Sequence, residues 1–154
     1  MNTSISIRTA ELDDLKTLLK FEQGAIKAAR PLDPFIDDAD LHYYNVPELI
    51  TAKNIHFIVA TIKTELIACG YIKLENSQHY HKNPIHGYVG FIYVKPSFRG
   101  QRISVLIIES LKHWSIKKGL KESRLDTYSN NIAALKSYKR FSFKKSLMNM
   151  RMDI

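Results

Sequence analysis

The chain has 154 residues, 45% of them hydrophobic and 25% charged, and a formal net charge of +8 from 23 Lys and Arg against 15 Asp and Glu. This length and composition are typical of one ordinary soluble globular domain built around a single core. No apolar run is long enough to span a bilayer, residues 1–4 carry no secretory signal, and one cysteine excludes an internal disulfide, so we expect a cytoplasmic protein with no membrane partner.

The first third of the chain predicts a strand, a long helix, an irregular segment and a short helix. Residues 4–8 alternate in hydrophobicity and predict a strand. Leucines at helical spacing then predict a helix from about Thr9 to Ile26. Two prolines end that pattern, and residues 30–47 are acidic and aromatic. A short helix is predicted over residues 47–52, with a proline in its first turn.

The rest of the chain predicts strand, strand, loop, strand, helix, strand, helix and a final pair of β segments: residues 55–62, 66–74, 77–86, 88–94, 105–118, 124–128, 131–140 and 143–152. The helix over residues 105–118 would end at Gly119 and turn four side chains inward: Leu106, Ile107, Leu111 and Trp114. The final segment would place Met148, Met150 and Met152 on one face. Cys69 lies in an apolar strand and is expected to be a buried, inert thiol.

The most informative stretch of the sequence is the turn between residues 94 and 104. An apolar strand ends at Pro96, a polar turn follows, and an amphipathic helix begins near Ser104. The N–H groups and the positive dipole end of a helix that starts there form an anion site. Arg99 and Arg102 add side chains suited to phosphate. The turn therefore predicts a phosphate-bearing cofactor.

The same turn resembles the acetyl-CoA-binding motif of the Gcn5-related N-acetyltransferases, Arg/Gln-x-x-Gly-x-Gly/Ala. Its six positions are Arg99, Gly100, Gln101, Arg102, Ile103 and Ser104. Arg102 and Ser104 stand where the family has small residues that let the backbone approach a pyrophosphate.

A second segment resembles the other signature of that family, Asn-x-x-Ala-x-x-x-Tyr-x-x-x-Gly-Phe. The matching positions are Asn131, Ala134, Tyr138, Ser142 and Phe143, with Ser142 in place of the glycine. The two motifs occur in the family's order, separated by one helix, one strand and a turn. The chain is therefore identified as a member of this family over nearly its whole length.

The resemblance implies an α/β (α+β) fold in a single domain over residues 1–154. Its mixed, mostly antiparallel sheet would have six to seven strands, about four flanking helices and a V-shaped opening between the central strands. Acetyl-CoA would be the co-substrate, and its pantetheine would pair with strand backbone in that opening, at Ile92, Tyr93 and Val94.

The resemblance also implies roles for individual side chains. Tyr138 matches the family's general acid, although a tyrosine there could instead only pack the helix against the sheet. Asn131 would contact the cofactor, cap its helix, or do both. Many relatives have a glutamate base where this chain has Tyr88, and His86 lies close by. A backbone N–H within residues 91–94 would hold the oxyanion.

The resemblance implies that the segment joining the first two helices, residues 30–47, covers the acceptor side, and the candidates lie there and at the end of the helix before it. They are Glu22, Arg30, Asp37 and Asp38, with Asp33 and Asp40 in the same acidic group. Carboxylates there would attract a cationic amine. The alternative is an exposed acidic loop without a binding role.

Three histidines, His79, His81 and His86, lie close enough in the sequence to be metal ligands, but the tract that holds them contains no cysteine or carboxylate, and no metal is expected. The basic residues are spread over helix faces and form no compact arm, which argues against a nucleic-acid partner.

Together these observations predict an acetyl-CoA-dependent N-acetyltransferase that acts on a primary amine of a small molecule or peptide. Transfer would be direct in a ternary complex, because no cysteine lies near the motifs to carry the acyl group. The alternatives are a non-catalytic CoA-binding sensor of the same fold, motivated by the replaced glycines, and a basic nucleic-acid-binding protein. Either a monomer or a homodimer is compatible with the sequence.

Overall fold

The computed structural model describes residues 4–154; residues 1–3, part of the start examined for a secretory signal, lie outside the described residues. The helices and strands follow in the order β1 (Ile5–Thr9), α1 (Leu15–Ala29), α2 (Val46–Thr51), β2 (Ile55–Ile62), β3 (Glu65–Asn76), β4 (Ile85–Val94), α3 (Ile103–Lys117), β5 (Ser123–Leu125) and α4 (Ile132–Arg140). Short 3₁₀ turns cover Leu12–Asp14, Arg30–Leu32 and Pro96–Phe98. Within residues 4–154 no helix is long and apolar enough to cross a membrane.

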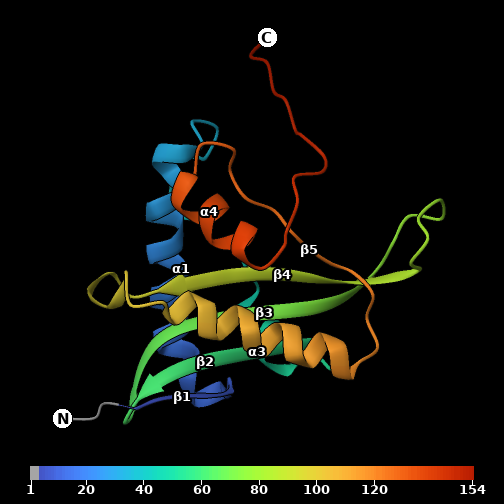
Figure 1. Cartoon of the computed structure of the whole chain (residues 1–154). Helices are drawn as coiled ribbons and strands as arrows, with labels where there is room; N and C mark the ends of the chain where they lie inside the picture. Colours follow the sequence, from blue (N-terminus) through green and yellow to red (C-terminus); the bar gives the residue numbers. More distant parts are fainter. Residues whose placement is uncertain (1–3) are drawn as a thin grey trace.

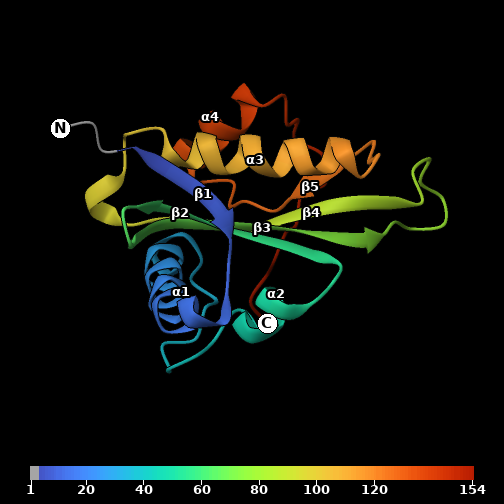
Figure 2. The same cartoon turned by 90° about the horizontal axis from the view of Figure 1, so that it is seen from below.

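One mixed sheet forms the middle layer of the molecule. Its strand order is β1-β2-β3-β4-β5, antiparallel except for the parallel pair β4–β5. Helices α1 and α2 cover one face, and α3 and α4 lie on the other (Figure 1 and Figure 2). The predicted α/β class and mixed sheet are thus confirmed, with five strands in the described residues rather than six to seven.

The central strands alternate between two hydrophobic cores. On β2, Phe57 and Val59 belong to the core under α1 and α2, while Ile58 and Ala60 belong to the core under α3. This alternation follows from the two-residue period of a strand. Burial of each large apolar side chain contributes about 1.5–3 kcal/mol, so both layers hold the sheet in place.

Helix α3 shows one departure from the predicted inward face. Ile107 and Leu111 are buried against the sheet as expected, and Trp114 packs on the same core. Leu106 is 38% exposed and points outward instead. The helix turns 100° per residue, so the face that carries Ile107, Leu111 and Trp114 excludes their neighbour at 106.

The predicted polar loop over residues 77–86 is shorter than expected. Strand β3 continues to Asn76 and β4 begins at Ile85, so that Glu75 pairs with His86. His86 is buried, and its ring contacts the Ser77 hydroxyl at 2.8 Å and the Glu75 carboxylate at 3.5 Å. These polar partners let a histidine occupy a strand position that its hydropathy did not suggest.

The predicted final pair of β segments is wrong for this structure. Residues 143–154 follow α4 as extended chain without strand pairing, and Figure 1 shows them projecting from the body. Met148, Met150 and Met152 share the expected alternation but are 74%, 86% and 79% exposed. Alternation predicts a strand only where a neighbouring strand offers hydrogen bonds, and none does so here.

A β-bulge bends β4 near its end. Cys69 pairs with Tyr93 and Tyr71 pairs with Gly90, which leaves two residues of β4 opposite one of β3. One of them, Phe91, has a positive φ of 49°. A side chain at Gly90 would place its Cβ 2.4 Å from the Tyr71 hydroxyl, so the bulge requires glycine there.

The bend separates β4 from β5. The two strands pair only from Gly87 to Val89 of β4 and from Ser123 to Leu125 of β5. Beyond Val89, β4 continues for the rest of its length with no neighbour on that side among the described strands. This is the V-shaped opening that the resemblance implied.

Candidate active site

The turn that follows β4 is built to receive an anion. Pro96 begins a 3₁₀ turn, Gly100 has a φ of 78°, and Arg102 is the N-cap of α3 with a φ of 61°. No side chain caps α3, so the N–H groups of its first turn lack the hydroxyl or carboxylate acceptor that usually satisfies them. Free N–H groups and the positive end of the helix dipole face the same space.

Arg99 connects this turn to the end of β4. Its Nε donates to the carbonyl oxygen of Val94 at 3.0 Å, and its guanidinium carbon lies 5.6 Å from the centroid of the Tyr93 ring. No hydrogen bond from its two Nη atoms is made within the described residues, and the residue is exposed. Arg99 therefore orders the turn, and its two Nη atoms remain able to donate hydrogen bonds to a further group.

The positions of two replaced glycines keep the backbone that glycine favours. Arg102 lies in the left-handed region at φ 61°, and Ser142, at the end of α4, lies there at φ 68°. Ser104 sits in the first turn of α3, where any residue fits. The substitutions thus change side chains and keep the course of the chain.

Helix α4 carries the second motif. The Asn131 side-chain oxygen accepts a hydrogen bond from the N–H of Ala134 at 3.2 Å, so Asn131 caps the helix. Tyr138 lies about two helical turns after Asn131. The centroid of its ring is 6.1 Å from that of Phe143, in an edge-to-face contact. Burial raises the pKa of Tyr138, so its hydroxyl stays protonated and able to donate. A packing role and a donor role are both compatible with this placement.

Tyr88 holds a carboxylate that the sequence analysis missed. Its hydroxyl donates to Asp126 Oδ2 at 3.0 Å. Burial and that neighbouring carboxylate raise the pKa of Tyr88, so the phenol is a donor, and the group able to take a proton is the Asp126 carboxylate. Asp126 is exposed and follows Leu125, the last residue of β5 to pair with β4, so it stands where the opening begins.

The position of Asp126 beside Tyr88 depends on the register between β4 and β5. Parallel pairing puts Tyr88 beside Arg124, and the residue two further along a strand projects from the same face. The register between strands that are separated by a whole helix cannot be fixed from one sequence, so the pair could not be aligned in advance.

The segment between α1 and α2, named the acceptor-side segment for its predicted role, is held by polar contacts of Glu22 and Arg30. Glu22 is fully buried, and its carboxylate accepts from the N–H of Tyr44 at 2.8 Å and contacts His42 Nδ1 at 2.6 Å. Arg30 donates to two carbonyl oxygens further along, those of Asp37 and Ala39. Both residues therefore fix the path of the segment from within.

The acidic residues of that segment differ in their surroundings. Asp33 is buried, accepts from the N–H of Phe35 at 3.0 Å, and is paired with Arg151 at 2.9 Å. Asp37 accepts from the N–H of Ala39 at 2.9 Å, closing a local turn, and remains exposed beside Asp38. Asp37, Asp38 and Asp40 are the carboxylates of this group that face solvent.

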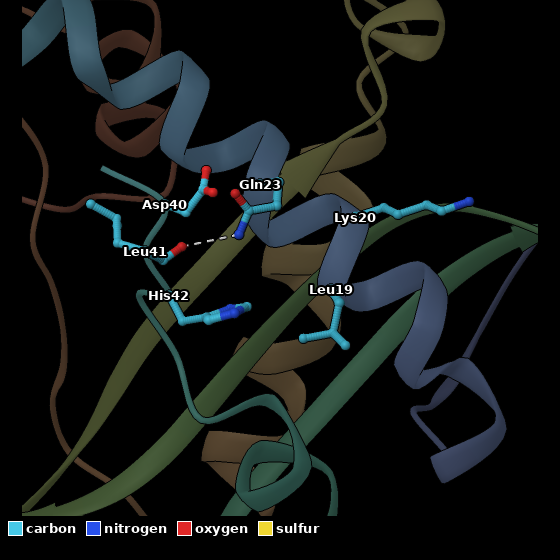
Figure 3. A pocket seen from close by; sticks show the side chains of 6 residues that line it. All are labelled: Leu19, Lys20, Gln23, Asp40, Leu41 and His42. Carbon is cyan, nitrogen blue, oxygen red and sulfur yellow. Dashed lines mark hydrogen bonds between the residues drawn. The ribbon is translucent and has the colours of Figure 1, made fainter. Parts of the chain in front are cut away.

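A groove of about 620 Å³ lies between α1 and this segment (Figure 3). It is lined by Leu19, Lys20, Gln23, Asp40, Leu41 and His42. Gln23 bridges the groove by donating to the carbonyl oxygen of Leu41 at 3.1 Å.

Aromatic rings connect this segment to the bulge of β4. The Tyr44 ring stacks on Phe91, with centroids 4.5 Å apart and planes inclined by 13°, and meets Tyr71 edge to face at 6.1 Å. Burial raises the pKa of Tyr71 to about 12, so its hydroxyl remains neutral at physiological pH. The acceptor-side segment and the bulge thus pack as one unit.

The three histidines are not gathered into one cluster, and only His86 has a carboxylate partner among the described residues, Glu75. His86 is buried in β4, whereas His79 and His81 are exposed in the preceding turn. Across residues 4–154, no group of three or more His, Cys, Asp and Glu side chains could hold a metal ion.

The site thus combines free N–H groups and two arginines at one turn with an unpaired strand edge, and the model of the Acetyltransferase (GNAT) family matches residues 15–143. The chain belongs to the acetyltransferase (GNAT) family. Among the curated proteins, none is matched by this sequence.

Solved structures show the same fold at low sequence identity. A mutant of the BH1408 protein from Bacillus halodurans is 17% identical with a TM-score of 0.87, over 97% of this chain and 99% of that one. A predicted acetyltransferase from Clostridium acetobutylicum, solved with acetyl-CoA, is 18% identical with a TM-score of 0.74, over 97% and 96%. The aminoglycoside N-acetyltransferase AAC(6')-Iy, solved with CoA, is 18% identical with a TM-score of 0.75, over 100% and 97%.

Proposed function

We propose that this chain is an acetyl-CoA-dependent N-acetyltransferase that moves an acetyl group to a primary amine of a small molecule or peptide. The observation that carries the proposal is the uncapped start of α3 beside the unpaired edge of β4. The pyrophosphate of acetyl-CoA suits the first, with Arg99 and Arg102 as cationic partners. Its amide-bearing pantetheine suits the second, along Ile92, Tyr93 and Val94.

The acetyl group would pass directly from acetyl-CoA to the amine within a ternary complex, because the one thiol of the chain is unsuited to carry it. Cys69 is fully buried in β3, and burial raises its pKa well above the ordinary value. A buried neutral thiol cannot form and release an acyl-enzyme. The amine nitrogen would therefore attack the thioester carbon directly, the carbon–sulfur bond would break, and the sulfur would leave as a thiolate.

Three proton transfers accompany this reaction, because the nitrogen goes from an ammonium to an amide N–H while the CoA sulfur gains one proton. The acceptor ammonium must lose one proton before attack, and the nitrogen loses a second one to water as the amide forms. The hydrogen bond from Tyr88 to the Asp126 carboxylate supports that carboxylate as the group that takes the first. The CoA thiolate must gain one, and Tyr138, whose pKa is raised, supplies it. We propose Asp126 as the base, Tyr138 as the acid and Tyr88 as the residue that positions Asp126.

The first experiment asks whether the chain is an enzyme. Calorimetry should show acetyl-CoA binding in the micromolar range, about −7 to −8 kcal/mol. A panel of primary amines, including aminoglycosides because a similar fold carries that activity, should then release free CoA. Binding without release from any amine would leave the sensor alternative, and absence of binding would contradict both.

The second experiment separates the acid from the base. Tyr138→Phe keeps the ring and should lower kcat on the order of 10²-fold with acetyl-CoA affinity nearly unchanged. Asp126→Asn should lower kcat/KM by a similar factor, again with acetyl-CoA affinity nearly unchanged. Tyr80→Phe, in the exposed turn before β4, is the matched control and should change neither. Full activity of Tyr138→Phe would exclude it as the acid.

We further propose that the acceptor is cationic. Asp37 and Asp38 are exposed on a segment that Glu22 and Arg30 hold against α1. Replacing both aspartates with asparagine should raise the KM for the amine by roughly tenfold, with little effect on acetyl-CoA binding. A best substrate with net negative charge would contradict this assignment.

Three further expectations from the sequence belong to this proposal. They are one catalytic domain over residues 1–154, a cytoplasmic location, and no nucleic-acid partner.

A further inference from the structure

A histidine with a buried carboxylate behind it lines the groove between α1 and the acceptor-side segment. Glu22 is fully buried, and its Oε1 lies 2.6 Å from His42 Nδ1. Its Oε2 accepts a hydrogen bond from the backbone N–H of Tyr44 at 2.8 Å. Two partners thus satisfy a carboxylate that would otherwise be costly to bury.

The carboxylate determines which nitrogen of His42 can take up a proton. An ionised carboxylate only accepts hydrogen bonds, so Nδ1 must carry the hydrogen that joins the two side chains. In the neutral ring, Nε2 is then the nitrogen with the free lone pair. Nε2 has no partner within residues 4–154, and 68% of the His42 side chain is exposed. The pair is therefore arranged to accept a proton from the groove.

The groove lies over the part of β4 along which the pantetheine is proposed to lie. Tyr44, two residues after His42, stacks on Phe91 of the bulge with ring centroids 4.5 Å apart. The other wall, α1, contacts the same strand, because the Phe21 and Tyr93 rings are 5.0 Å apart. Figure 3 shows β4 passing behind the space between the helix and the segment. His42 therefore stands on the acceptor side of the strand opening.

Two other charged side chains line the groove, Lys20 from α1 and Asp40 from the segment, and both are exposed. In Figure 3 the Lys20 side chain points away from His42, and the Asp40 carboxylate lies near Gln23. Asp40 could also accept a proton, but no side chain within residues 4–154 orients it as Glu22 orients His42. Among the groove residues, His42 combines a proton-accepting atom with a fixed orientation.

We infer that His42 receives, through water in the groove, the second proton that the amine nitrogen loses, and that Glu22 positions His42 for this step. The role rests on the proposed N-acetyltransferase activity. When the nitrogen lone pair forms the carbon–nitrogen bond, the nitrogen becomes positively charged. Water carries its excess proton to His42 Nε2, and the buried carboxylate stabilises the imidazolium that forms.

The remaining bonds and protons then balance. The carbon–sulfur bond breaks with its electron pair on sulfur, and the sulfur takes the proton of Tyr138. Of the two protons held by Asp126 and His42, one restores Tyr138 and the other leaves to solvent. One proton is released per turnover, as the conversion of an ammonium and a thioester to an amide and a thiol requires.

The first test is His42→Gln, assayed with the primary amine that releases CoA fastest. The glutamine amide can still donate to Glu22, so Tm should stay close to that of the wild type, but the side chain cannot take up a proton. We expect kcat to fall roughly 10–100-fold with acetyl-CoA affinity unchanged. His79→Gln, at an exposed histidine in the turn before β4, is the matched control and should change neither.

Glu22→Gln tests the positioning role. It should lower kcat in the wild type and add little further loss to His42→Gln, because both act on one proton transfer. Additive losses would show that Glu22 acts apart from His42. Wild-type kcat in His42→Gln would overturn the proposal while leaving the acetyltransferase activity in place. If the wild type releases CoA from no amine, the proposed function fails, and this role fails with it.

Chemical rescue tests whether the ring of His42 acts as a base. His42→Ala leaves space at an exposed position, and added imidazole should raise its kcat at least about tenfold, measured against blanks without the amine. Pyrazole, a ring of the same size but a far weaker base, should not raise it. Equal rescue by imidazole and pyrazole would mean that the ring only fills space, and it would overturn the proposal.

Discussion

Arg102 and Ser142 show how motif glycines can be replaced without altering the chain path. Each lies at a positive φ, in the region that costs an L-residue about 1 kcal/mol and glycine almost nothing. The two residues occupy the start of α3 and the end of α4, where the backbone must turn sharply. The family's glycines are therefore explained here by backbone conformation as well as by the approach of a phosphate.

Arg102→Gly should leave the fold intact. We expect the free energy of unfolding, measured by urea denaturation, to stay the same or rise by up to about 1 kcal/mol, because relief of the left-handed strain outweighs the entropy that glycine adds to the unfolded chain. Arg102→Ala keeps the strain and is the matched control. If Arg102→Gly abolished acetyl-CoA binding while Arg102→Ala retained it, the backbone at this turn would be at fault; loss in both would make the guanidinium indispensable.

Residue roles followed from the sequence only where a role depends on local spacing. Asn131 as a helix cap and Cys69 as a buried thiol depend on their immediate neighbours, and both are confirmed. Asp126 depends on the pairing of two strands separated by α3, and it was missed. The buried contacts of Glu22 are also long-range, because His42 and Tyr44 lie 20 and 22 residues further along the chain and reach it only after the segment folds back.

At the scale of the elements, an ion pair joins the acceptor-side segment to the C-terminal arm, residues 144–154. Arg151 hydrogen-bonds Asp33 and holds the pKa of that carboxyl below its ordinary value. A lowered pKa means that the contact stabilises the structure at any pH above the ordinary carboxyl range near 4. The stabilisation is lost as the pH falls through the lower, folded-state pKa.

The Arg151–Asp33 contact can be tested by titration. NMR of the Asp33 carboxyl should give a lower pKa in the wild type than in Arg151→Gln, and the variant should show faster motion of residues 144–154 at neutral pH. Lys145→Gln, which removes a basic residue of the arm without an ion pair among the described residues, should leave the Asp33 pKa unchanged. Equal Asp33 pKa values in the wild type and Arg151→Gln would show that the ion pair does not form in solution.

Most elements could be predicted because hydrophobic period and turn residues act locally. Strand β2 was predicted with its observed bounds. For α1, α3 and α4, the predicted end that lies next to a motif or a helix-stop signal falls within a few residues of the observed end. The arm could not, because its alternation fits a strand and only the absence of a neighbour in the monomer decides otherwise. The bulge in β4 could not be predicted either, because nothing in the sequence of this strand indicates a positive φ at Phe91.

At the scale of the whole molecule, the net charge of +8 could serve either a nucleic acid or a small anionic ligand, and the distribution of the basic residues distinguishes the two. A nucleic-acid-binding protein concentrates its basic residues in one surface that follows a phosphate backbone. Here Arg99 and Arg102 lie at a single turn that faces the start of one helix, which suits one small polyanion. The two alternatives predict different responses of thermal stability to added ligand.

Acetyl-CoA at a hundredfold excess over its dissociation constant should stabilise the folded state by about 2.7 kcal/mol. For a chain of this size, that corresponds to a rise in Tm of about 5–10 °C. The shift should shrink as ionic strength is raised at fixed ligand concentration, because salt screens the phosphate contacts of Arg99 and Arg102. A DNA duplex at equal phosphate concentration and physiological salt is the control, and it should leave Tm unchanged. Should the duplex raise Tm while acetyl-CoA does not, the basic charge would serve a nucleic acid, and the uncapped start of α3 would have to be explained without a cofactor.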